Sequence, residues 1–131
     1  MQPMLPVGSV RAPLRILLVE DNAEGRESLQ KLLILLGHEV MAVADGEGGL
    51  SLGLETRPDV AIIDIGLPQM DGRQVAEGLR RTLGAEVRLI AYTAYEEGEG
   101  GRRCAVFNDW VMKPAELMGL LSCLDRKGQR S

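Results

Sequence analysis

The strongest constraint on the fold is a set of five short apolar runs separated by segments with helical spacing. The runs are Ile16–Val19, Val40–Val43, Val60–Ile63, Val87–Ala91 and Trp110–Met112. The first and third are continuous and show no polar alternation, which is typical of strands buried on both faces of a parallel sheet. The regular alternation of strands and helices therefore predicts an α/β fold of five strand–helix units, (βα)₅.

The segments between the runs carry helix signals of different strength. After the first run, apolar residues at i, i+3, i+4 and i+7 predict a helix that Gly37 ends; they are Leu29, Leu32, Leu33 and Leu36. Residues 46–56 predict a weaker helix, because glycines at 48, 49 and 53 lower its propensity. Glycines at 98, 100 and 101 likewise predict a short or poorly ordered helix before Trp110.

The most apolar runs are expected at the centre of the sheet, because helices cover central strands on both faces. Right-handed crossovers then leave few arrangements. The order 2-1-3-4-5 places the first and third strands in the middle and is that of the flavodoxin-like doubly wound sheet. In such sheets the functional crevice lies beyond the carboxyl ends of the strands.

Length and composition fit one domain with two short extensions. Of the 131 residues, 14–125 contain the strand and helix signals. Residues 1–13 hold three prolines and predict a flexible, linker-like arm, whereas residues 126–131 predict a basic, solvated tail. The start shows no signal-peptide pattern, and no apolar run approaches the ~20 residues of a membrane span, so we expect a cytoplasmic protein without a membrane partner.

Charge and aromatic content exclude several function classes. Nineteen acidic against 15 basic side chains give a net charge of −4, which argues against a nucleic-acid partner. One Trp, two Tyr and one Phe are too few for a sheet that stacks bases. The two cysteines, Cys104 and Cys123, lack the paired spacing of a zinc site or a disulfide framework.

Polar side chains follow four of the predicted strands at their carboxyl ends. They are Glu20 and Asp21 after the first strand, Asp64 after the third, Thr93 after the fourth and Lys113 after the fifth. Singly, each has a structural explanation, such as Asp21 as a helix cap or Asp64 as the start of a turn. Together, three carboxylates at one edge repel one another unless a cation binds. Oxygen ligands without His or Cys favour Mg²⁺ over zinc.

An acidic cluster, a lysine and a hydroxyl group at one edge suit the transfer of a phosphoryl group to an aspartate. These residues resemble the receiver domain of response regulators in two-component and phosphorelay signalling, and are similar to the chemotaxis regulator. The resemblance covers residues 14–125 and rests on four motifs: Glu20-Asp21, Asp64 with Gly66–Gly72, Thr93-Ala94 and Lys113-Pro114.

The resemblance implies a role for each residue of the acidic cluster. Asp64 would accept a phosphoryl group from a sensor histidine kinase or a histidine phosphotransfer protein. Asp21, Asp64 and the backbone carbonyl of Gly66 would bind Mg²⁺, with Glu20 acting through a water molecule. Lys113 would pair with the phosphoryl oxygens.

The resemblance also implies a conformational switch. Thr93 would move to hydrogen-bond the phosphoryl group, and Ala94 would donate its backbone N–H to it. Trp110 occupies the position of the aromatic switch residue, and Pro114 is expected to follow Lys113 through a cis peptide bond. The segment between Thr93 and Lys113 is short for this family. In the family this segment usually carries contacts for dimerisation or output, and whether it does so in this chain is left open.

These residues together predict a phosphoacceptor signalling domain rather than an enzyme with turnover. The alternative is a receiver-like scaffold that binds its partner without phosphorylation. A flavodoxin would need a hydroxyl-rich phosphate loop after the first strand, and a haloacid-dehalogenase-type phosphatase would need Asp-x-Asp; Glu20 and Asp21 stand there instead. We expect a stand-alone regulator or the receiver of a hybrid kinase, with the cognate kinase, signal and target left open.

Overall fold

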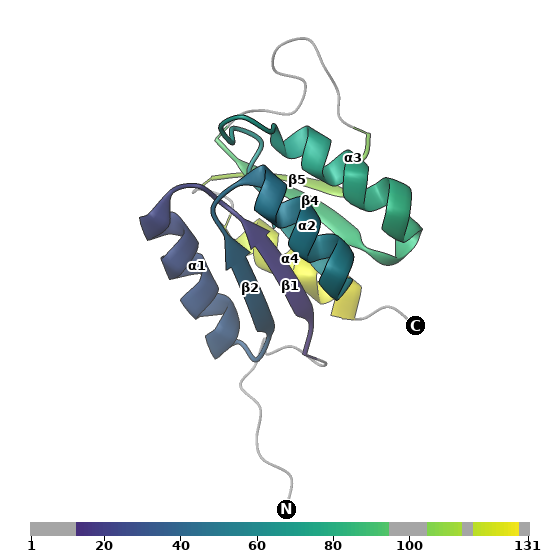
Figure 1. The fold of residues 1–131 in the computed structure, drawn as a ribbon. Coiled ribbons are helices and arrows are strands. Elements are labelled where there is room, and N and C mark those ends of the chain that lie inside the picture. Colours follow the sequence, from purple (N-terminus) through teal and green to yellow (C-terminus); the bar gives the residue numbers. More distant parts are fainter. Residues whose placement is uncertain (1–12, 95–104, 114–116, 129–131) are drawn as a thin grey trace, which may run out of the picture.

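The computed structural model describes residues 13–94, 105–113 and 117–128, in which a five-stranded parallel sheet lies between helices (Figure 1). The strands are β1 (Arg15–Val19), β2 (Glu39–Val43), β3 (Val60–Ile63), β4 (Arg88–Thr93) and β5 (Asp109–Met112). The helices are α1 (Ala23–Leu35), α2 (Gly46–Thr56), α3 (Gly72–Leu83) and α4 (Leu117–Gly128), with a short 3₁₀ helix, η1 (Gly84–Glu86).

The strand order is β2-β1-β3-β4-β5, and every neighbouring pair is parallel. This confirms the predicted flavodoxin-like arrangement, with β1 and β3 among the inner strands. The register aligns the carboxyl ends of these two strands, because Val19 pairs with Ile63. The residues that follow them, Glu20 and Asp64, therefore leave the sheet side by side.

Two apolar cores explain why the central strands show no alternation. Leu17 and Val19 belong to the buried cluster on the face covered by α2 and α3, whereas Ile16 and Leu18 belong to the cluster under α1 and α4. All four side chains are at most 1% exposed. Because helices cover both faces of β1, its polar neighbours are confined to the strand ends.

Helix α2 covers the predicted range 46–56 despite its glycines, because these glycines let it approach strand β1 and helix α3 closely. A Cβ atom at Gly49 would lie 2.7 Å from Val19 Cγ2, and one at Gly53 would lie 2.6 Å from Leu79 Cδ2. Both distances are shorter than the separation at which carbon atoms attract one another. Tertiary packing therefore offsets the low helix propensity of this segment.

Side-chain caps start the first three helices directly after a strand or its loop. The side chains of Asn22, Asp45 and Asp71 accept backbone N–H groups in the first turns of α1, α2 and α3, at 2.7, 2.6 and 2.7 Å. Asn22, rather than its neighbour Asp21, is the cap of α1. The carboxylate of Asp21 is therefore not used to start this helix.

Several predictions concern residues outside those described. They are the helix expected before Trp110, which falls on residues 95–104, the arm up to residue 12, and the cis peptide bond at Pro114. Helix α4 continues through residues 126–128, and the division into arm, domain and tail stays a prediction. In the described part of the chain, no helix is long and apolar enough to cross a bilayer.

The guanidinium group of Arg80 ties the end of α3 to the segment that leads into β5. It donates to the carbonyl oxygens of Gly84, Val87 and Val106 and to Oδ1 of Asn108, at 2.7, 2.7, 3.2 and 2.7 Å. The same Oδ1 accepts the N–H of Leu89 in β4 at 2.7 Å. The Arg80 side chain thus holds in place the segment that precedes β5, the strand that contains Trp110 and is followed by Lys113.

Replacing Arg80 by Met should lower the free energy of unfolding by about 2 kcal/mol, because four acceptors lose their donor, two of them in partly buried hydrogen bonds. Urea unfolding followed by circular dichroism measures the change. The matched control is Arg81→Met, at the exposed neighbouring position, which should alter stability by less than about 0.5 kcal/mol. Equal stabilities for the two variants would contradict the role assigned to Arg80.

Candidate functional site

Three carboxylates converge beyond the carboxyl ends of β1 and β3. Glu20 and Asp21 follow β1 and Asp64 follows β3, and each offers an oxygen atom within 4.8 Å of the others. Glu20 is buried, Asp64 is half-buried and Asp21 is exposed. The cluster is therefore open to solvent on the side of Asp21.

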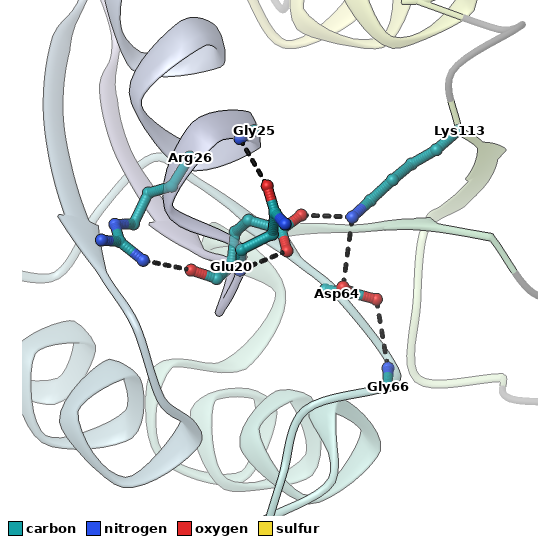
Figure 2. Close-up of polar contacts among 7 residues, drawn as sticks. Glu20, Gly25, Arg26, Asp64, Gly66 and Lys113 are labelled. Carbon is teal, nitrogen blue, oxygen red and sulfur yellow. Dashed lines mark hydrogen bonds and ion pairs between the residues drawn. The ribbon is translucent and has the colours of Figure 1, made fainter.

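Lys113 brings a positive charge to the same place from the end of β5. Its ammonium group forms ion pairs with Glu20 Oε1 and with Asp64 Oδ2, the latter at 3.2 Å. The backbone N–H of Lys113 donates to the carbonyl oxygen of Thr93 at 2.8 Å, which anchors the residue to the end of β4. Figure 2 shows the lysine side chain extending from the end of β5 to both carboxylates.

Further hydrogen bonds hold Glu20 in place, and its backbone N–H donates to the Val43 carbonyl oxygen at 3.1 Å. Its Oε2 atom accepts the Asn22 N–H at 3.1 Å. Its backbone carbonyl oxygen accepts a hydrogen bond from the guanidinium group of Arg26 at 3.0 Å (Figure 2). Burial raises the pKa of Glu20, and the hydrogen bonds from Lys113 and Asn22 only partly oppose this effect. A cation beside the buried carboxylate would favour its charged form.

The charge of Lys113 is stabilised by its neighbours. Burial alone would lower the pKa of Lys113, but its hydrogen bond to Glu20 and the charge of Asp64 outweigh burial and raise the pKa. The ammonium group therefore stays protonated at neutral pH and offsets part of the negative charge. Its Nζ atom also lies 5.9 Å from the ring centroid of Tyr92, within the range of a cation–π contact.

The loop after Asp64 turns back sharply to start α3. The Gly66 N–H donates to Asp64 Oδ1 at 3.1 Å, and the Gly72 N–H donates to the Ile65 carbonyl oxygen at 3.2 Å. A Cβ atom at Gly72 would lie only 2.2 Å from the carbonyl oxygen of Asp64. Only glycine fits against this backbone, so the position of Asp64 depends on Gly72.

The remaining predicted residues surround the cluster without joining it. Thr93 ends β4, the strand beside that of Asp64, and is fully buried, while the next residue, Ala94, is exposed. Trp110 lies within β5 and packs against the core on the α2–α3 face. The structure thus gathers the predicted acids and the lysine around one point and places the predicted aromatic switch position to one side.

The donor atoms of the cluster fit a hard divalent cation. They are carboxylate oxygens from three residues, and no nitrogen or sulfur ligand belongs to the cluster among the residues that the structure describes. Mg²⁺ takes a few carboxylate oxygens and fills its remaining positions with water or phosphate oxygens. A carboxylate beside a cation and an ammonium group can accept a phosphoryl group, because both charges stabilise the transferred oxygens.

Two contacts near the site have no counterpart in the sequence analysis. They are the ring of Tyr92 beside the Lys113 ammonium group and the guanidinium group of Arg73 over the ring of Trp110. Neither Tyr92 nor Arg73 is part of a recognisable motif. Tertiary structure alone brings each to its partner, and the only sequence signal is the place of Tyr92 next to Thr93.

Replacing Gly72 by Ala should lower the free energy of unfolding by about 3 kcal/mol, because the added methyl group overlaps backbone atoms that cannot rotate away. Gly53→Ala is the matched comparison, since its overlap is with a methyl group of Leu79 that can move. It should cost clearly less, about 1 kcal/mol, partly because Ala favours helix. Urea unfolding measures both variants, and a larger loss at Gly53 would contradict this assignment.

Comparison with known proteins identifies the domain. The family model of the response regulator receiver domain matches residues 16–125. Response regulator MprA of Mycolicibacterium vanbaalenii is 34% identical over 113 residues, which cover 84% of this chain and 48% of that protein. Transcriptional regulatory protein AfsQ1 of Streptomyces coelicolor is 34% identical over 125 residues, covering 88% and 52%. The chain thus spans about half the length of these curated relatives.

Solved structures agree with this assignment. The receiver domain of sensor histidine kinase PA1611 from Pseudomonas aeruginosa, solved with a magnesium ion in its active site cleft, shares 32% identity at a TM-score of 0.72, covering 86% of this chain and 97% of that one. Chemotaxis protein CheY4 of Vibrio cholerae shares 28% identity at a TM-score of 0.78, covering 88% and 98%. The chain belongs to the response regulator receiver domain family, the signalling domains of two-component systems.

Proposed function

We propose that Asp64 accepts a phosphoryl group from the phosphohistidine of a sensor histidine kinase or a histidine phosphotransfer protein, and that the domain then signals to a protein partner. The observation that carries this proposal is the ammonium group of Lys113, 3.2 Å from Asp64 Oδ2 within a cluster of three carboxylates. Such a cluster is costly without a ligand, because half-buried like charges repel one another. Membership of the receiver family supports the proposal.

In the proposed reaction a carboxylate oxygen of Asp64 attacks the phosphorus atom of the phosphohistidine. An O–P bond forms and the N–P bond breaks, and the imidazole of the donor leaves with the electron pair and takes up a proton. The product is an acyl phosphate. No general base is needed, because the attacking carboxylate has no proton to lose. The domain is therefore a phosphoacceptor that catalyses its own modification and slow dephosphorylation, and not an enzyme with turnover.

The same site would hold Mg²⁺. Its ligands would be the carboxylates of Asp21 and Asp64 and the backbone carbonyl of Gly66, with Glu20 acting through a water molecule. When bound, Mg²⁺ supplies positive charge to the oxygens of the transferred group. The three acids within 4.8 Å of one another support this proposal, and so does the magnesium ion in the cleft of the related receiver domain.

Lys113, Thr93 and Ala94 would bind the transferred group. The Nζ atom of Lys113 already contacts Asp64 Oδ2, so a phosphoryl group on that carboxylate comes within its reach. The Thr93 hydroxyl would donate to a second phosphoryl oxygen, and the Ala94 backbone N–H to a third. Because these contacts exist only after transfer, they favour one conformation over the other. Trp110 is the residue proposed to transmit that change.

The proposal also covers the organisation of the chain. Residues 14–125 would form the receiver, preceded by an arm over 1–13 and followed by a basic tail over 126–131, and the domain would act in the cytoplasm. We propose that the domain binds protein partners and binds neither nucleic acid nor a membrane. This chain spans about half the length of the curated relatives, so we assign it none of their downstream partners.

Incubation with acetyl phosphate and Mg²⁺ should add one phosphoryl group to the wild-type chain, detected by intact-protein mass spectrometry. Asp64→Asn should show no gain, because an amide oxygen is a poor nucleophile, and chelation of Mg²⁺ should abolish the gain in the wild type. Asp59→Asn is the matched control, since Asp59 precedes β3 whereas Asp64 follows it. A gain that persists in Asp64→Asn would refute the assignment, and partner binding unaffected by this variant would favour the scaffold alternative.

Removing the ammonium group with Lys113→Met should tighten Mg²⁺ binding about tenfold, because the acids lose their internal counter-ion. Isothermal titration calorimetry measures the dissociation constant. Arg88→Met breaks a different partly buried ion pair, the 2.7 Å contact with Asp109, and should leave Mg²⁺ affinity unchanged. Weaker Mg²⁺ binding in Lys113→Met would show that the lysine orders the cluster for the metal rather than competing with it.

A further inference from the structure

The ring of the chain's single tryptophan, which packs on the α2–α3 face, contacts one aromatic and one cationic side chain. The ring of Phe107 meets Trp110 edge-on, with centroids 5.8 Å apart and planes at 87°. The guanidinium carbon of Arg73 lies 5.8 Å from the centroid of the Trp110 ring. An arginine over an indole face at this distance attracts it electrostatically, and the attraction grows where water is excluded.

Arg73 belongs to the first turn of α3, close to the loop that begins at Asp64. Its backbone N–H donates to Asp71 Oδ1 at 2.7 Å, and its Nη1 atom lies 3.5 Å from Asp71 Oδ2. The intervening Gly72 packs so closely on the backbone of Asp64 that no Cβ atom fits between them. A displacement of the Asp64 loop would therefore be passed to the start of α3, and with it to Arg73.

Hydrogen bonding does not account fully for the position of the Arg73 side chain. Its Nε atom is buried and has no hydrogen-bond partner within the described residues. A buried donor without an acceptor costs free energy, which another interaction must offset. Its ion pair with Asp71 is long, at 3.5 Å, and the ring of Trp110 is a second group whose attraction can offset this cost.

We propose that Arg73 is a positioning residue for Trp110: it holds the indole in the described orientation and couples it to the Asp64 loop. This inference rests on the proposed function in one respect, namely that Trp110 moves when Asp64 is modified. Such a movement would give up the contact with Arg73. A ligand shifts the equilibrium between two conformations only by the difference in its affinity for them. Part of that difference would be used to break the contact between Arg73 and Trp110, so Arg73 would set how much ligand is needed for activation.

The first test needs no ligand, because all tryptophan fluorescence comes from Trp110. In Arg73→Met, the rate constant for acrylamide quenching should rise at least about twofold and the near-ultraviolet dichroism of the indole should weaken, since the indole loses its cationic neighbour. Arg73→Lys keeps the charge and should recover part of the difference. The exposed Arg81→Met, at the far end of α3, should behave as wild type.

Far-ultraviolet dichroism and urea unfolding verify that each variant is folded. If Arg73→Met does not fold, the comparison of Arg73→Lys with the wild type decides, because a Lys ammonium group is compact and covers less of the indole face than a planar guanidinium group. Unchanged quenching in folded Arg73→Met, or in Arg73→Lys where it is the only folded variant, would overturn the positioning role.

The second test measures the coupling with beryllofluoride and Mg²⁺, which mimic the phosphoryl group. Fluorescence titration of Arg73→Met should give a half-maximal beryllofluoride concentration about 2- to 30-fold lower than that of the wild type, the range expected for one cation–π contact. Equal half-maximal concentrations would overturn the coupling. A wild-type chain that does not respond at all would instead refute the proposed function, while the ligand-free quenching measurement would still decide the role of Arg73.

Discussion

The burial of β1 and β3 on both faces is the constraint on which the rest of this structure depends. Helices cover both sides of these strands, so a polar side chain has no place along them and is confined to their ends (Figure 1). Because the strands are parallel, their carboxyl ends meet at one edge of the sheet. Glu20, Asp64 and Lys113, far apart in the sequence, are therefore in contact. The burial of apolar strands thus determines where the polar residues of the site lie.

The concentration of negative charge at this edge of the sheet makes it a candidate binding site for a cation. Three acids and one lysine amount to a formal charge of −3 + 1 = −2 at one point, which is half of the chain's net charge of −4. Lys113 stabilises the cluster only in part, and a divalent cation would complete the neutralisation. The same lysine lies where a negatively charged group on Asp64 would need a partner. In the proposed function, one counter-ion would therefore serve both the free and the phosphorylated site.

Much of this could be predicted from the sequence, because the informative features are local. The apolar runs mark the strands, and the acids that follow them mark the edge where they meet. Even helix capping is predictable to within one residue: Asp21 was a candidate cap, and Asn22 is the cap. The contacts of Tyr92 with Lys113 and of Arg73 with Trp110 could not be predicted, because each depends on how elements pack across the sheet. The close packing of the α2 glycines against β1 and α3 could not be predicted for the same reason.

Those glycines also have a consequence for how the domain folds. A segment with so little intrinsic preference for helix gains few turns on its own in the unfolded chain, because helix nucleation is costly and glycine adds to the entropy that must be lost. Its close seating on Val19 and Leu79 exists only once β1 and α3 are in place. We therefore expect helix α2 to form late in folding, after the strands and the helix on which it packs. A folded helix α2 therefore indicates that the sheet on which it packs is also folded.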